Sequence, residues 1–229
     1  MFKDIKEKVY EANMELYYSK LVILTWGNVS ARYKDYVAIK PSGVKYEVMK
    51  SDDIVIINLD GNVIEGNLNP SSDTSTHLEL YKAFPDINGI CHTHSNYATS
   101  FAQSGKSIKA MGTTHADYFY GDVPCTRELS QYETENDYEI NTGKVIIETF
   151  KNIDYNMIPA VLVKHHGIFT WGKSASESVQ NAIVLEEIAK MNFQTEMLSK
   201  ENNILAQYTL DKHYRRKHDK NAYYGQIKE

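Results

Sequence analysis

Cysteine is scarce in this chain, and no stretch of it is long and apolar enough to cross a membrane. The two cysteines, Cys91 and Cys125, are too few for a disulfide framework and indicate reduced, buried thiols. No apolar run approaches the roughly 20 residues of a transmembrane helix. Residues 1–7 are mixed in charge, so we expect no signal peptide and a cytoplasmic protein.

The chain also lacks a net positive charge, a linker and a repeat. Its formal net charge of -5 argues against nucleic acid or an acidic membrane surface as a partner. No proline-, glycine- or serine-rich tract divides it, and no segment recurs at a fixed period. With 42% hydrophobic residues, which is typical of a soluble globular protein, the 229 residues can form one large domain.

Helices and strands are predicted to intermix along the chain. The Asp60-Gly61-Asn62 sequence predicts a hairpin turn, and therefore some antiparallel pairing. The Ser174–Glu177 segment has the form of a capping box that opens a long helix. These features predict an α/β layered domain with a mixed sheet. Apolar spacing predicts further helices over 3–18, 74–84, 96–104, 142–151 and about 203–217, and strands over 36–39, 54–58, 89–94 and 160–163.

Two histidines at alternate positions, His92 and His94, lie at the end of a predicted strand. Side chains at i and i+2 of a strand point to the same face, so both imidazoles can reach one divalent cation. A third histidine, His166, stands far downstream, just before Gly167. Three histidines from neighbouring strand ends would leave one coordination position open, as in catalytic metal sites.

Three polar segments carry groups suited to an anion. Residues 71–74, Ser-Ser-Asp-Thr, begin a predicted helix, where amide N–H groups and hydroxyls can bind phosphate or simply cap the helix. Residues 40–43, Lys-Pro-Ser-Gly, supply a cation, a hydroxyl and a glycine amide, or form an ordinary turn. In the segment 26–30, Gly27 lets the backbone approach a ligand closely and Asn28 can donate from its side chain. Together the three segments can build one phosphate pocket.

Two further segments are polar but ambiguous by themselves. In the segment 112–118, Asp117 is a candidate general acid or base, although a self-satisfied polar loop explains the segment equally well. The tail 210–226 is basic and aromatic. It can be a solvated helix with a frayed end, or a terminus docked over a neighbouring subunit's site.

Taken together, these segments resemble the class II aldolase/epimerase family, and within it the L-ribulose-5-phosphate 4-epimerases. The matching segments span essentially the whole chain in order, from Trp26 through the histidines to Gln226. The run from Gly112 to Arg127 and the tail are the most specific. The resemblance implies one three-layer α/β/α domain over residues 1–229, with a central mixed, largely antiparallel sheet.

The resemblance also implies roles for individual residues. His92, His94 and His166 resemble zinc ligands, with Asp73 beside the metal; manganese or cobalt can replace zinc at such sites. Asp117 and Tyr224 resemble the acid/base pair, with Tyr224 coming from an adjacent subunit. The positions that match those holding the substrate or lining its site are Asn28, Lys40, Ser42, Gly43, Ser71, Ser72, Thr113, Glu139 and His213.

The implied assembly is a cyclic homotetramer with sites at subunit interfaces, where the tail 210–229 completes a neighbour's site. The implied substrate is a phosphorylated ketopentose, L-ribulose 5-phosphate, interconverted with D-xylulose 5-phosphate. Because C4 is not adjacent to the carbonyl, deprotonation does not reach it, whereas retro-aldol cleavage of C3–C4 does. A divalent metal stabilises the resulting charge. The tethered aldehyde rotates and is attacked on its other face, so Asp117 and Tyr224 serve opposite faces. Arabinose catabolism and ascorbate-type degradation both use this reaction.

Two other functions stay open. A sibling sugar-phosphate aldolase would release the fragments, but those relatives carry a glutamate base where this chain has Asp73. A non-catalytic adducin-like interaction module would have lost the metal ligands that this chain keeps. In residues 165–169, His-His-Gly-Ile-Phe replaces the usual Ser-His-Gly-Pro-Phe, so His165 competes with His166 as a ligand. His166 is favoured because it directly precedes the glycine.

Overall fold

The structure, a computed structural model, describes residues 2–199, 201, 203–220 and 222–225. Within these residues the helices are α1 Lys3–Tyr18, α2 Thr74–Ala83, α3 Asn96–Ser104, α4 Thr113–Ala116, α5 Gln131–Glu135, α6 Tyr138–Thr149, α7 Ala175–Leu198 and α8 Gln207–His218, with a short 3-10 turn at Ser51–Asp53. The strands are β1 Asn28–Tyr33, β2 Tyr36–Ile39, β3 Val55–Asn58, β4 Val63–Glu65, β5 Gly89–Thr93, β6 Ala160–Val163 and β7 Gly167–Gly172.

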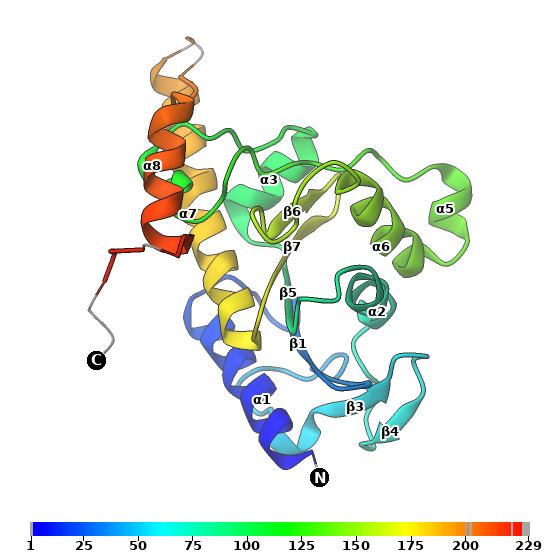
Figure 1. Cartoon of the computed structure of the whole chain (residues 1–229). Helices are drawn as coiled ribbons and strands as arrows, with labels where there is room; N and C mark the ends of the chain where they lie inside the picture. The colour runs from blue at the N-terminus through cyan, green and yellow to red at the C-terminus, as the bar shows by residue number, and fades with distance from the viewer. Residues whose placement is uncertain (1, 200, 202, 221, 226–229) are drawn as a thin grey trace.

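The described strands form one sheet in the order β4-β3-β2-β1-β5-β7-β6. Every neighbouring pair in it is antiparallel, and the one parallel contact is an isolated bridge between Cys125 and Leu162. Helices α1, α3 and α7 cover one face, while α2 and α6 lie on the other (Figure 1). The predicted three-layer α/β/α fold with a largely antiparallel sheet is therefore confirmed.

The central strands are buried on both faces. Strands β5, β6 and β7 are buried at every position, which explains why they are rich in consecutive apolar residues instead of alternating ones. Strand β4, at the edge, is exposed throughout. The histidines lie at the ends of β5 and β7, which have ladder partners on both sides.

Most predicted elements are confirmed to within a residue or two. Helices α1, α2 and α3 and strands β2, β3 and β6 match the predicted ranges, and the 60–62 turn joins β3 to β4. Helix α6 begins four residues earlier than predicted, and α8 four residues later than its predicted start near 203. Strands β1 and β7 were missed because their polar residues, such as Ser30 and Thr170, are buried by tertiary contacts that no local pattern reveals. No described helix has the length and hydropathy needed to cross a bilayer.

Candidate functional site

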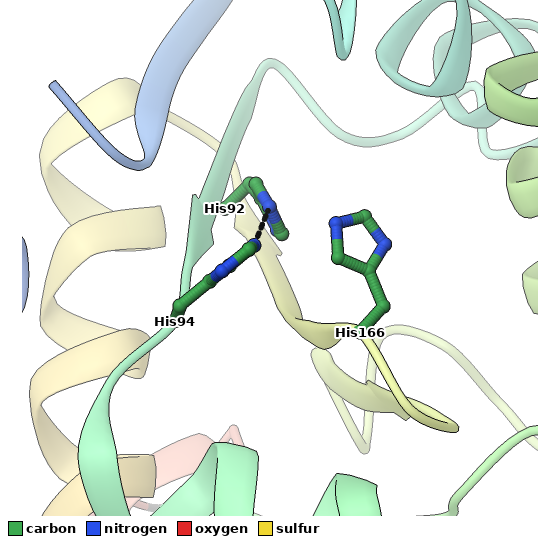
Figure 2. Close-up of side chains that lie close together, drawn as sticks. All are labelled: His92, His94 and His166. Atoms are coloured by element: carbon green, nitrogen blue, oxygen red, sulfur yellow. Dashed lines mark hydrogen bonds between the residues drawn. The ribbon is translucent and has the colours of Figure 1, made fainter.

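Three histidines converge at one end of the central strands. His92 lies in β5, where it pairs with Asn28 of β1 on one side and Phe169 of β7 on the other. His94 lies just beyond the end of β5, and His166 stands in the turn before β7. Figure 2 shows the three rings facing a common space. One potential ligand atom from each lies within 4.8 Å of the others, which is close enough for all three to bind one ion.

The hydrogen bonds of these rings suit metal ligands. His92 Nδ1 lies 2.8 Å from the Ile168 carbonyl oxygen, which can only accept, so Nδ1 carries the proton and Nε2 is left bare. His92 Nε2 and His94 Nε2 are 3.0 Å apart. His166 Nδ1 is buried and has no hydrogen-bond partner. His166 turns its other ring nitrogen, Nε2, toward His92 and His94 (Figure 2), so the three histidines can each direct one nitrogen at a single divalent cation.

Two of the rings, His94 and His166, are also held in the neutral form that binds metals. Burial, and then the neighbouring His92, lowers the pKa of His94 to about 4. Burial is likewise the main cause that lowers the pKa of His166. Neutral imidazole has a free lone pair at neutral pH, so neither of these two ligands needs to lose a proton before binding an ion.

Glycine is required on both sides of the histidines. A Cβ at Gly167 would lie 2.6 Å from the Thr93 carbonyl oxygen and 2.8 Å from His94 Cδ2. A Cβ at Gly27 would lie 2.7 Å from the His92 carbonyl oxygen, and Gly27 also has a left-handed φ of +72°. Both backbones therefore approach the site more closely than any other residue would allow.

Asp73 adjoins the histidines from the start of α2. Its Oδ2 accepts a 2.7 Å hydrogen bond from Asn28 Nδ2 and lies 3.9 Å from His92 Nε2. Asn28 Oδ1 is buried and has no hydrogen-bond partner. Asn28 thus anchors the carboxylate with one end of its amide and offers an unused acceptor with the other.

A cavity of about 570 Å³ opens beside the histidines. It contains all ten of the predicted metal and phosphate residues, together with four neighbours from the same segments. Backbone hydrogen bonds hold the segments together, from Ser71 N to the Lys40 carbonyl at 3.0 Å and from Ser42 N to the Asn69 carbonyl at 2.9 Å. The lining residues are Thr25, Trp26, Gly27, Asn28, Lys40, Pro41, Ser42, Gly43, Ser71, Ser72, Asp73, His92, His94 and His166.

Lys40 is a buried cation in the wall of this cavity. Its Nζ donates to the Val44 carbonyl at 2.9 Å and to the Pro41 carbonyl at 3.3 Å, and it lies 4.8 Å from the centre of the Tyr46 ring. None of these partners carries a negative charge. Burial lowers the pKa of Lys40 to about 8. An anion bound in the cavity would raise that pKa again and would be attracted by the fully charged ammonium group.

Asp117 lies in a second cluster, outside the lining of the histidine cavity. Arg216 Nε and Nη2 bind its two oxygens at 2.9 and 2.6 Å, His213 Nδ1 lies 3.2 Å from Oδ1, and Lys217 Nζ lies 3.8 Å from Oδ2. His218 Nε2 lies 2.9 Å from the Asp117 carbonyl oxygen. Burial raises the pKa of Asp117, but the Arg216 hydrogen bond and the surrounding charges outweigh it and leave that pKa below its ordinary value.

Of the remaining predicted residues, Tyr224 and Thr113 lie with Asp117, whereas Glu139 lies in neither place. The Tyr224 ring lies over Arg216 and Lys217, at 5.0 and 4.4 Å, and so belongs with Asp117. Thr113, exposed at the start of α4, accepts the Asp117 amide through its carbonyl oxygen at 3.0 Å. Glu139 lies in α6, where its carbonyl accepts a hydrogen bond from Thr76. Gln226 falls outside the described residues.

The two neighbouring histidines, His165 and His166, point in different directions. His165 is exposed with a left-handed φ of +63°, and its Nε2 lies 3.6 Å from Glu128 Oε2. His166 alone joins His92 and His94. The sequence reasoning missed Arg216 and Lys217 as partners of Asp117; only their place in the basic tail hinted at them. It also missed Tyr46, which nothing in the local pattern marks.

The fold and site define a sheet-based domain in which three histidines that can bind one cation lie beside a cavity suited to an anion. Residues 7–193 match the model of the Class II Aldolase and Adducin N-terminal domain family, and the chain belongs to this family. Members of the family typically depend on a divalent metal, which the histidine cluster can bind.

Solved structures with the same fold include several sugar-phosphate enzymes. An L-fuculose 1-phosphate aldolase is 27% identical, with a TM-score of 0.76, and the match covers 93% of this chain and 95% of that one. The L-fuculose 1-phosphate aldolase of Glaciozyma antarctica PI12 is 19% identical, with a TM-score of 0.78 and coverage of 96% and 84%. YgbL of Klebsiella pneumoniae, described as an aldolase, epimerase or decarboxylase, is 20% identical, with a TM-score of 0.73 and coverage of 93% and 99%. The last two likenesses bear on the fold alone.

Proposed function

We propose that this protein is an L-ribulose-5-phosphate 4-epimerase, an isomerase that interconverts L-ribulose 5-phosphate and D-xylulose 5-phosphate. It would do so by breaking and re-forming the C3–C4 bond. The observation that carries the proposal is the setting of Asp73. Its carboxylate accepts a hydrogen bond from Asn28 and lies beside His92, so these contacts hold it at the histidine cluster. Proton transfer is then left to other groups, as an epimerase that works on two faces requires.

His92, His94 and His166 would hold the metal, which we take to be Zn²⁺, with Mn²⁺ or Co²⁺ as functional substitutes. The ion would supply Lewis-acid stabilisation of the negative charge that carbon–carbon cleavage places on the sugar oxygens. Asn28, with its unused buried acceptor, would orient a sugar hydroxyl next to it. Lys40, Ser42, Gly43, Ser71 and Ser72 would bind the substrate phosphate and keep the cleaved fragment in place.

Asp117 and Tyr224 would exchange protons with the two faces of the aldehyde. In one chain neither residue lines the histidine cavity, which supports a site built from two subunits. We therefore propose a homotetramer in which one subunit's tail, with Tyr224, completes its neighbour's site, and in which Thr113, Glu139 and His213 line the joint pocket. Arg216 would have to release part of its hold on Asp117, because a doubly bound carboxylate is a weak base.

The second candidate function is a class II sugar-phosphate aldolase. It is favoured by the 27% identity to a protein called an L-fuculose 1-phosphate aldolase. The two functions share the bond-breaking step, and they differ in whether the aldehyde is retained and attacked again on its other face. The same cavity suits both, and Asp73, one methylene shorter than the glutamate base of the aldolases, favours the epimerase.

The deciding experiment is incubation of the zinc-loaded protein with L-ribulose 5-phosphate, with the products resolved by NMR. We expect D-xylulose 5-phosphate without free glycolaldehyde phosphate. Release of the two fragments would instead establish the aldolase. If the protein binds zinc and neither reaction occurs, the proposed substrate is wrong. A His166→Ala sample serves as the matched blank, because it should lack the metal.

A further inference from the structure

Tyr46 contacts three residues that line the anion cavity, Lys40, Trp26 and Gly27, without lining it itself. Its side chain is among the largest fully buried ones in the described chain, although it stands in a loop and not in a strand or helix. One face of its ring carries the Lys40 ammonium at 4.8 Å. The Tyr17 ring stacks on it at 5.4 Å, with the two planes only 7° apart. Tyr46 is therefore held from several sides before any ligand arrives.

The hydroxyl of Tyr46 reaches the turn that leads into β1. It lies 2.9 Å from the Gly27 carbonyl oxygen and 3.1 Å from the Trp26 carbonyl oxygen, so its single proton can bond to either. In a trans peptide the C=O and the following N–H point in opposite directions. With the Trp26 carbonyl turned toward Tyr46, the Gly27 N–H is turned away from it. Gly27 lines the cavity, whereas Tyr46 does not.

The second carbonyl has a parallel consequence for β1. Because the Gly27 carbonyl faces Tyr46, the Asn28 N–H is turned toward the opposite side, where Asn28 pairs with His92 of β5. The Tyr46 hydroxyl therefore sets the orientation of the peptide from which Asn28 begins the strand. One side chain thus contacts both the buried cation of the cavity and the turn that contributes Trp26, Gly27 and Asn28 to its lining.

We propose that Tyr46 is a positioning residue for anion binding: its ring holds the Lys40 ammonium and its hydroxyl holds the Trp26–Asn28 turn, so that both face the same anion. This inference rests on the proposed function, because it concerns how that function's phosphate is held. Tyr46 touches no substrate and acts only through Lys40 and the backbone of the turn.

The test separates the two halves of this role with inorganic phosphate as the probe. Tyr46→Phe keeps the ring and removes the hydroxyl, and we expect phosphate to bind about 3- to 10-fold more weakly, as the loss of one hydrogen bond predicts. Tyr46→Leu removes the ring face as well and should cost roughly a further 3-fold or more. The matched control is Tyr17→Phe, which removes a hydroxyl from the outer ring of the same stack and should leave the phosphate Kd unchanged. Phosphate and zinc affinities are both measured by calorimetry.

A purely structural role would weaken zinc and phosphate binding together. We expect the zinc Kd of Tyr46→Phe to stay that of the wild type while the phosphate Kd rises. Lys40→Met combined with Tyr46→Leu should weaken binding by less than the product of the two single effects, since both act through one ammonium group. Unchanged phosphate binding in Tyr46→Phe, parallel loss of zinc, or full additivity would each overturn the inference. If the wild type binds no phosphate, or Lys40→Met binds it normally, the phosphate pocket of the proposed function itself fails.

Discussion

The histidine cavity and the Asp117 cluster are electrostatic opposites. In the cavity, Lys40 is a buried cation that contacts two carbonyls and a ring face, and Asn28 has a buried oxygen with no hydrogen-bond partner. At Asp117, one carboxylate is contacted by Arg216, Lys217 and His213. The cavity therefore has polar groups that a ligand can bind, whereas the charged groups of the Asp117 cluster are already paired with one another within the chain.

This difference bears on how each region binds a ligand. Buried polar atoms without partners are costly, so they favour any ligand that satisfies them. A saturated ion-pair cluster must first give up contacts. The cavity is built on paired strands of the sheet, whereas Asp117 is held between the short α4 and α8 near the end of the chain. The polar groups of the cavity are therefore in place on paired strands, whereas the proposed reaction requires the Asp117 cluster to give up some of its contacts.

The largest expected effect comes from the histidines. His166→Ala should lose bound zinc and reduce turnover by more than about 100-fold. Removing even a residue that only hydrogen-bonds to a metal ligand typically lowers metal affinity or activity about 10- to 100-fold. The control is His165→Ala, since His165 is exposed and faces Glu128. Metal content by mass spectrometry and turnover by NMR check both variants. Zinc loss in His165→Ala instead would reverse the assignment of the ligand.

The second-largest loss of turnover is expected for Asp117→Asn. We expect turnover to fall about 10²- to 10⁴-fold, the usual contribution of a general acid or base, while zinc and phosphate bind normally. Asp211→Asn is the control, because Asp211 is a carboxylate of α8 that bonds to Tyr120 and Gln207 instead. Loss of metal from Asp117→Asn would contradict the separation of the two regions.

Mixing two inactive variants tests whether the tail of one subunit completes the histidine cavity of its neighbour. His166→Ala, which lacks a proposed metal ligand in the cavity, and Tyr224→Phe are each expected to be nearly inactive alone. If Tyr224 acts on a neighbour's site, mixed oligomers contain some sites with both groups intact, and the mixture should exceed either parent. The exchange of subunits is verified by mass spectrometry of the intact oligomers; exchanged but inactive mixtures would argue against shared sites.

Lys40 predicts a smaller, pH-dependent effect. Its pKa of about 8 means that it is charged below pH 8 and neutral above it. Sulfate keeps one charge state across this range, so its affinity should be constant below pH 8 and fall as the pH rises through that value. The pKa of His94, near 4, keeps that ring neutral throughout. Lys40→Arg, whose charge persists, should remove the dependence; sulfate calorimetry from pH 6.5 to pH 9.5, roughly one and a half units either side, measures it.

The smallest effect concerns Arg216. Arg216→Gln should raise the pKa of Asp117 toward its ordinary value, because the strongest opposing hydrogen bond is gone. A carboxyl whose pKa is lowered by folding stabilises the protein above its unfolded pKa, and this contribution is lost as the pH falls. The variant should therefore be less stable than the wild type at neutral pH, with a difference that vanishes in acid. Urea unfolding at several pH values checks this.

Much of the site was predictable because its residues stand at element ends. The strand through His92, the helix after Ser71 and Ser72, and the turn after Lys40 are all visible as local patterns, and ten predicted residues do share one cavity. The pairing of His92 with Asn28 was not predictable, since β1 itself was not recognised. Nor was the hold of Arg216 on Asp117, 99 residues away in sequence.

The sequence by itself determined which segments are candidates for chemistry: three histidines, a lysine followed by serine and glycine, and a polar stretch around Asp117. Local spacing and residue type are sufficient for that, because they act over a few residues. Only the tertiary structure decided which of two adjacent histidines joins the cluster, that Lys40 is buried beside Tyr46, and that Asp117 is ion-paired to α8. These outcomes depend on strand pairing and burial between distant segments, and no local pattern encodes them.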